Sequence, residues 1–108
     1  MSADEIVSVY AVFGNDEEAR RIARHAVELG LAACVNILGP CHSIYRWQGK
    51  VEEADEVAAL FKTSATRARE LVDTIGRLHS YEVPAAVVWT IAEAPEVYRQ
   101  WVVENSKR

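Results

Sequence analysis

Residues 5–13 alternate like a β-strand, and both faces of that strand are mostly apolar. One face carries Val7, Val9, Ala11 and Phe13, and the other carries Ile6, Ser8, Tyr10 and Val12. A strand that is apolar on both sides is typical of the centre of a covered sheet. The pattern therefore predicts a central strand with cover on two sides.

Two later segments repeat their apolar residues at helical spacing and are expected to pack on a sheet. The first follows Asn15, a predicted N-cap, and ends at Gly30; its first turn is acidic, which the helix dipole favours. The second follows Ser64 or Thr66 as its cap and ends at residues 79–81.

The C-terminal part predicts one more strand and a short helix. Pro84 cannot donate to a strand ladder, so the strand through residues 87–91 begins near it or lies on an edge there. Pro95 at the first helical position then opens a helix with Tyr98 and Trp101 on one stripe. This aromatic stripe needs a surface to cover.

The longest predicted feature is a β-hairpin over residues 33–63, with a polar tip at Gln48-Gly49-Lys50. Its first arm, Cys34 to Trp47, would span roughly 45 Å at about 3.3 Å per residue, whereas a compact domain of this length has a radius of gyration of about 13 Å. Even with a bend at Gly39-Pro40, the far end should overhang the core with unpaired backbone groups. We therefore expect another copy of the chain to pair with the hairpin.

The predicted order is β-α-β-β-α-β followed by a helix, which is the ferredoxin-like α+β arrangement. Residues 1–108 are expected to form a single domain, with both main helices on one face of an antiparallel sheet. Since the first strand is apolar on both sides, the other face should be covered by subunit partners or by the terminal helix.

Charge and composition exclude several classes of protein. A net charge of -4, with Lys and Arg scattered along the chain, argues against a nucleic-acid partner. The first 14 residues have no basic start and only a short alternating apolar part, so we expect no signal peptide, no membrane partner and a cytoplasmic location. Cys34 and Cys41 lie on one strand arm and are not expected to form a disulfide.

Four side chains are candidates for a small-molecule or ion site. Trp47 is two residues from Tyr45 on one strand face, and such rings suit a subunit contact as well as an organic ligand. Lys62 closes an apolar strand and needs an acidic or carbonyl partner; without a carboxylate it could hold an anion together with Tyr81. His79 could cap helix carbonyls or act as a pocket group.

Other polar and aromatic groups have simpler explanations. Trp89 and Trp101 could extend an aromatic wall that packs at an interface, and His25 and His42 are expected on the solvated surface. The acidic residues between positions 52 and 56 alternate between two strand faces and lack the glycine and spacing of a calcium loop. No nucleophile-base-acid pattern or phosphate-binding glycine motif is readable.

Four sequence blocks occur in order: LAACVNI at 31–37, SIYRWQGKVEE at 43–53, the strand 56–63 ending in Lys-Thr, and HSYEVP at 79–84. Together they resemble the CutA divalent-cation tolerance proteins along nearly the whole chain. The resemblance implies a ferredoxin-like homotrimer, joined by β-pairing through the long hairpin, with pockets between subunits and an architecture similar to PII-type signalling trimers. It also implies a role in tolerance of divalent metals, with copper as a ligand of some members.

At the positions where copper-binding members are expected to carry ligands, this chain has Val12, Leu78 and Ala85, which leaves His79. One histidine does not make a selective transition-metal site, although three subunits could share one.

The resemblance and the residues leave three functions open. The first is a non-catalytic binding or regulatory trimer linked to divalent metal tolerance. The second is a direct copper or other divalent-metal binder through His79. The third is an enzyme or small-molecule sensor with Trp47, Lys62, His79 and Tyr81 in an intersubunit cleft.

Overall fold

The computed structural model describes residues 5–107, which form one antiparallel sheet with helices against it. Along the chain the elements are β1 (Ile6–Phe13), α1 (Asp16–Glu28), β2 (Cys34–Trp47), β3 (Lys50–Ser64), a 3-10 turn (Ala65–Arg67), α2 (Ala68–Leu78), β4 (Ala86–Thr90) and α3 (Glu96–Asn105). The strand order is β2-β3-β1-β4, and every pairing is antiparallel. This arrangement confirms the predicted ferredoxin-like fold with a C-terminal helix.

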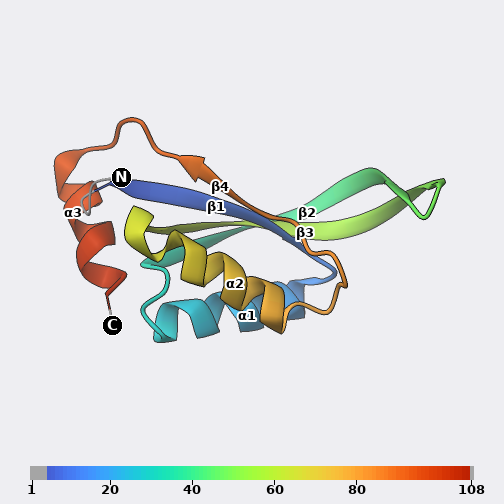
Figure 1. Cartoon of the computed structure of the whole chain (residues 1–108), viewed down its shortest axis with the longest axis horizontal. Coiled ribbons are helices and arrows are strands. Elements are labelled where there is room, and N and C mark those ends of the chain that lie inside the picture. The colour runs from blue at the N-terminus through green and yellow to red at the C-terminus, as the bar shows by residue number, and fades with distance from the viewer. Residues whose placement is uncertain (1–4, 108) are drawn as a thin grey trace.

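The hydrophobic core lies between the sheet and the layer formed by α1 and α2 (Figure 1). Phe13 and Phe61 from the sheet meet Ile22 of α1 and Leu71 and Ile75 of α2, and each of these side chains is at most 1% exposed. The helix-facing residues of β1 are fully buried because the amphipathic stripes of both helices cover them. β1 is the central strand that the pattern predicted.

The helix starts agree only partly with the predicted caps. The Asn15 side chain accepts the backbone N–H of Glu18 at 2.8 Å, which confirms this cap of α1. For α2 the prediction holds only in position: Ser64 is the N-cap residue of the 3-10 turn that leads into the helix, but no side chain caps the turn or the helix. The hydroxyl of Ser64 instead lies 3.3 Å from that of Thr66. Pro95 is the N-cap of α3 and not its first helical residue, so this helix begins one residue later than predicted.

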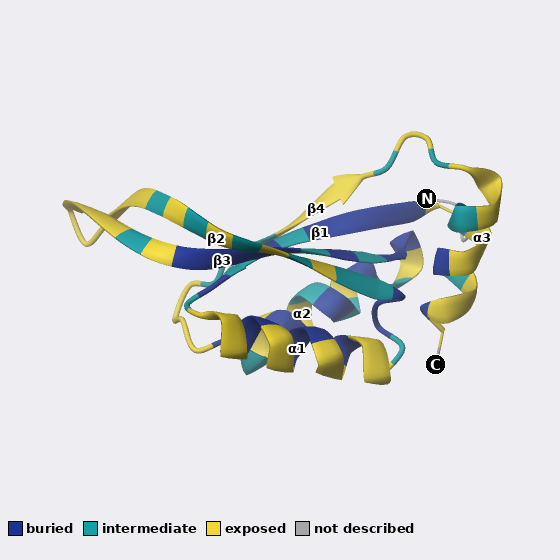
Figure 2. Ribbon diagram, turned by 180° about the vertical axis from the view of Figure 1, so that it is seen from behind, coloured by how far each residue is buried: buried dark blue, intermediate teal, exposed yellow. Residues whose placement is uncertain are grey.

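The β2–β3 hairpin projects beyond the helices and dominates the shape of the molecule, whose longest extent is 44 Å (Figure 1). Its tip is a two-residue turn in which Gln48 and Gly49 have φ angles of 51° and 81°, as a type I′ turn requires. A bulge between Ile37 and Gly39 bends the first arm, and Gly39 permits it with a φ of 101°. The burial colours show an exposed far end, so the predicted overhang is confirmed (Figure 2).

The sheet face opposite α1 and α2 is only partly covered. α3 packs at the end of the sheet away from the hairpin tip, where Val102 is buried against Ile6 and Ala33 (Figure 1). Farther along this face, Trp89 stacks on Tyr10 with ring centroids 5.0 Å apart. Trp89 remains 51% exposed, so α3, which packs around Ile6 and Ala33, leaves this part of the face open.

Candidate binding cavity beside the hairpin

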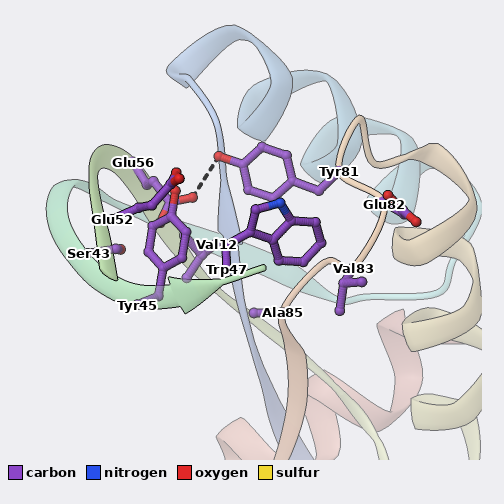
Figure 3. A pocket seen from close by; sticks show the side chains of 10 residues that line it. All are labelled: Val12, Ser43, Tyr45, Trp47, Glu52, Glu56, Tyr81, Glu82, Val83 and Ala85. Carbon is purple, nitrogen blue, oxygen red and sulfur yellow. Dashed lines mark hydrogen bonds between the residues drawn. The ribbon is translucent and has the colours of Figure 1, made fainter. Parts of the chain in front are cut away.

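A cavity of about 530 Å³ lies between the hairpin and the loop of residues 79–85, which joins α2 to β4 and is called the cavity loop below (Figure 3). This volume is within the usual range for small-molecule sites. The lining residues come from the end of β1, from both hairpin arms and from the cavity loop: Val12, Ser43, Tyr45, Trp47, Glu52, Glu56, Tyr81, Glu82, Val83 and Ala85. Trp47 and Tyr81, two of the four predicted site residues, therefore share one cavity.

A hydrogen bond between Tyr81 and Glu56 closes one wall of this cavity (Figure 3). The Tyr81 hydroxyl donates to Oε2 of Glu56 at 2.6 Å. Burial, followed by the carboxylate of Glu56, raises the pKa of Tyr81 far above its ordinary value, so the phenol stays a donor at physiological pH. Gly14 makes room for the ring, since a Cβ there would lie 3.2 Å from the Tyr81 hydroxyl.

Glu18, in the first turn of α1, anchors the cavity loop. It is 4% exposed, and its carboxylate accepts the backbone N–H groups of Ser80 at 2.8 Å and Gly14 at 3.3 Å. Burial would raise the pKa of Glu18, but the hydrogen bonds from Ser80 and Gly14 outweigh burial and lower it. The sequence identified Glu18 only as an acid in a first helical turn, because its partner loop lies 62 positions away.

His79 is buried beside the cavity and does not line it. Its Nε2 donates to the carbonyl oxygen of Val12 at 2.7 Å, and its Nδ1 accepts the N–H of Tyr81 at 3.0 Å. The ring lies nearly parallel to Phe13, with centroids 5.1 Å apart. The prediction that the imidazole caps helix carbonyls was wrong, because the ring instead donates to the carbonyl oxygen of Val12 in β1.

Lys62 lies at the other end of the sheet from the cavity. It is six residues along β3 from Glu56, or roughly 20 Å in a strand. Its Nζ donates to Oδ1 of Asn36 at 2.7 Å, so the carbonyl-type partner expected for this amine comes from the amide of a neighbouring strand. Within one chain, Lys62 and Tyr81 do not meet.

The predicted aromatic wall is divided into separate groups within one chain. Tyr45 and Trp47 line the cavity, whereas Trp89 of the edge strand β4 stacks on Tyr10 of the neighbouring β1. Trp101 stacks on Tyr98 within α3, with centroids 6.0 Å apart. The predicted wall does not form within one chain, because sequence periodicity shows which face of the sheet a residue occupies but not where it lies along that face.

The acidic residues of β3 are split between two faces, as the alternation predicted. Glu52 and Glu56 line the cavity. Glu53 and Asp55 hold His42 instead, at 2.6 Å from Nε2 and 2.8 Å from Nδ1. His42 is exposed as expected, and these two hydrogen bonds raise its pKa.

The residues present fit a copper ion poorly. Val12 and Ala85 put apolar surface into the cavity, and Leu78 packs against the core. His79 would have to give up one of its two ring hydrogen bonds to bind a metal. Within residues 5–107, the structure brings together no group of three His, Cys, Asp or Glu side chains suited to a metal ion.

The fold and the cavity define a small ferredoxin-like α+β protein with an overlong hairpin and a candidate ligand cavity beside the outer half of that hairpin. The family described as CutA1 divalent ion tolerance protein matches residues 7–105 of the chain. The chain belongs to this family. A divalent-cation tolerance protein CutA from Thermus thermophilus is 45% identical over 92 residues, which cover 85% of this chain and 89% of that protein.

Solved structures of CutA proteins share the whole architecture. The periplasmic divalent cation tolerance protein CutA from Archaeoglobus fulgidus superposes with a TM-score of 0.91 at 34% identity, covering 94% of this chain and 99% of that one. The divalent cation tolerance protein from Thermus thermophilus gives a TM-score of 0.89 at 42% identity, covering 93% and 97%. No helix in the described part of this chain is long and apolar enough to cross a membrane.

Proposed function

We propose that the protein is a homotrimeric, non-catalytic binding or regulatory protein that serves tolerance of, or response to, divalent metal ions. Membership of the CutA1 family supports the link to divalent ions. The projecting hairpin carries the proposal of assembly, because it exposes more pairing surface than a monomer needs.

The hairpin is unpaired along both of its outer sides. β1 pairs with β3 only over residues 57–64, so residues 50–56 of β3 have β2 as their one neighbour in the described structure. The outer edge of β2 pairs with no described strand over its whole length. Unpaired edges invite pairing with a further chain. The exposed Ile44 and Val51 near the tip, at 67% and 63%, add apolar surface that assembly would bury.

The cavity chemistry supports binding more than catalysis. Its polar groups are carboxylates, phenols, an indole and the hydroxyl of Ser43, and no histidine or lysine is among the ten lining residues. A serine nucleophile needs an adjacent base that a third group orients. In the described structure, the side-chain hydrogen-bond partner of the Ser43 hydroxyl is the thiol of Cys41, at 4.0 Å.

Light scattering at micromolar concentration tests the assembly. We expect about three times the chain mass of 12.1 kDa for the wild type. The double variant Ile44→Lys/Val51→Lys should shift the mass toward that of one chain, whereas Arg69→Ala, on the exposed surface of α2, should not. A stable wild-type monomer would remove the basis of the proposal.

Growth in elevated copper or zinc tests the physiological role. A strain that lacks the gene should lose tolerance, and the wild-type gene should restore it. Cell fractionation of the same strains would test the expected cytoplasmic location, which the two free thiols of Cys34 and Cys41 support.

The two alternatives have narrower support. A copper or other divalent-metal site at His79 is supported by the family's name but requires the loss of a ring hydrogen bond. An enzyme or small-molecule sensor is supported by the shared cavity of Trp47 and Tyr81. An anion held by Lys62 and Tyr81 together would need the two residues to come from different subunits.

A further inference from the structure

The cavity beside the hairpin combines aromatic walls with negative charge. Tyr45, Trp47 and Tyr81 supply three rings. Its charged groups are all carboxylates, from Glu52, Glu56 and Glu82, and none of the ten lining residues is Lys, Arg or His. This composition selects against anions and favours a ligand that carries positive charge and apolar surface together.

Glu56 is the buried acid in this cavity. The residue is 8% exposed, and Oε2 accepts the hydroxyl of Tyr81. In the described structure Oε1 takes part in no hydrogen bond, although Glu56 lines the cavity. Oε1 is not one of the buried atoms that lack a partner, so it is open to the cavity. A cation in the cavity would pair with this oxygen and supply a countercharge to a carboxylate that is largely removed from water.

The three rings suit an organic cation better than a bare metal ion. Tyr45, Trp47 and Tyr81 are each about 40% exposed, so part of each ring remains free for a ligand. A cation over an aromatic face is attracted by the negative face of the ring, and alkylated ammonium groups are recognised in this way. Hard divalent ions prefer several oxygen ligands at close range, and among the described residues no three His, Cys, Asp or Glu side chains converge to provide them.

We infer that this cavity binds a small organic cation of the alkylammonium class, with Glu56 as countercharge and Trp47 and Tyr81 as the walls. The geometry supports it: the indole of Trp47 and the ring of Tyr81 line the same cavity, and the Tyr81 hydroxyl points to Glu56 (Figure 3). The inference rests on the proposed role as a binding protein and names the class of its ligand. It makes this chain a receptor for an organic cation.

Indole N–H signals in a two-dimensional ¹⁵N–¹H NMR spectrum of the full chain offer a site-specific test. The chain has three tryptophans, so three indole signals are expected, and the spectrum of Trp47→Phe assigns one of them. Choline is the probe, and 3,3-dimethyl-1-butanol is its uncharged equivalent of nearly the same shape. We expect choline to move the Trp47 signal in a saturable way. The alcohol should bind more weakly than choline by a factor of about ten at least.

Substitutions identify the charge that matters. Glu56→Gln keeps an acceptor for Tyr81 but removes the charge, and it should weaken choline binding about tenfold. Glu93→Gln, at an exposed position outside the cavity, is the matched control and should leave binding unchanged. Glu52→Gln provides a second cavity variant if the Glu56 variant does not fold.

Four results would overturn the inference. These are equal binding of choline and the alcohol, preferential binding of propionate, equal shifts of all three indole signals, and no shift with choline at all. If a cationic side chain of a neighbouring subunit fills the cavity, choline will not bind and Glu56→Gln will weaken assembly. Light scattering on the same samples separates the two proposals, since a trimer without choline binding contradicts only the ligand.

Discussion

The Nε2 atom of His79 donates a hydrogen bond to the carbonyl oxygen of Val12 at 2.7 Å, while Nδ1 of the same ring accepts the N–H of Tyr81. This pair of bonds requires the neutral tautomer with its proton on Nε2. This one side chain thereby links the end of α2 to Val12 of the central strand β1 and to Tyr81 of the cavity loop. Its role in this arrangement is to hold the loop.

Replacing His79 by alanine should therefore destabilise the fold without changing copper binding. The substitution removes two hydrogen bonds of a buried ring and its stacking on Phe13, so we expect a loss of about 2–4 kcal/mol in the free energy of unfolding. Urea denaturation measures this loss, with His25→Ala on the exposed surface of α1 as the control. Calorimetry with copper should give the same affinity for wild type and variant at a temperature where both are folded. Loss of copper binding in a folded variant would instead support the metal-site alternative.

Substitution of Glu18 by glutamine should remove stability in a pH-dependent way. Hydrogen bonds from Ser80 and Gly14 hold the pKa of this buried carboxylate below its ordinary value of 4.5, in spite of burial. A lowered folded-state pKa gives stability that is present above pH 4.5 and is lost as the pH falls through the folded value. At pH 7 the variant should lose about 1–3 kcal/mol, and the difference from wild type should shrink below pH 4.5. Glu17→Gln, exposed and next in sequence, should show almost no loss at either pH.

The contrast between Asn15 and Glu18 shows how far the sequence could predict this site. The cap at Asn15 is a local interaction across three positions, so residue type and order were enough to predict it. The bonds of Glu18 to Ser80 and of Tyr81 to Glu56 join positions far apart, and they depend on how the cavity loop crosses the sheet. Strand alternation correctly divided the acids of β3 between two faces. The predicted hairpin also separated Trp47, beside the tip, from Lys62, at the base, within one chain. Neither the alternation nor the hairpin could show that Tyr81 shares a cavity with Trp47, because that depends on the path of the cavity loop.

The hairpin arms should be held together more firmly at acid pH. Hydrogen bonds from His42 to Glu53 and then to Asp55 raise its pKa above the ordinary 6.5. A raised folded-state pKa gives stability that is fully present below pH 6.5 and is lost as the pH rises through the folded value. Hydrogen exchange of the hairpin amides should therefore show an extra, pH-dependent gain of protection in wild type that His42→Gln lacks. NMR titration of the His42 ring would contradict this explanation if its pKa were at or below 6.5.

Gly14 and Tyr81 should show strong energetic coupling. An added Cβ at residue 14 would lie 3.2 Å from the Tyr81 hydroxyl and 3.4 Å from its Cε1, so Gly14→Ala must push the ring and strain its bond to Glu56. We expect Gly14→Ala to cost about 1–2 kcal/mol and Tyr81→Phe to cost about 1 kcal/mol. The double variant should lose less stability than the sum of the two single losses, by at least about 0.5 kcal/mol, because the phenol oxygen nearest the new methyl group is gone. Gly76→Ala is the matched control, because a Cβ there meets nothing within 4 Å and α2 gains a better helix former. Full additivity of Gly14→Ala and Tyr81→Phe would show that the two residues do not depend on each other, and that the cavity wall is positioned by the rest of the loop.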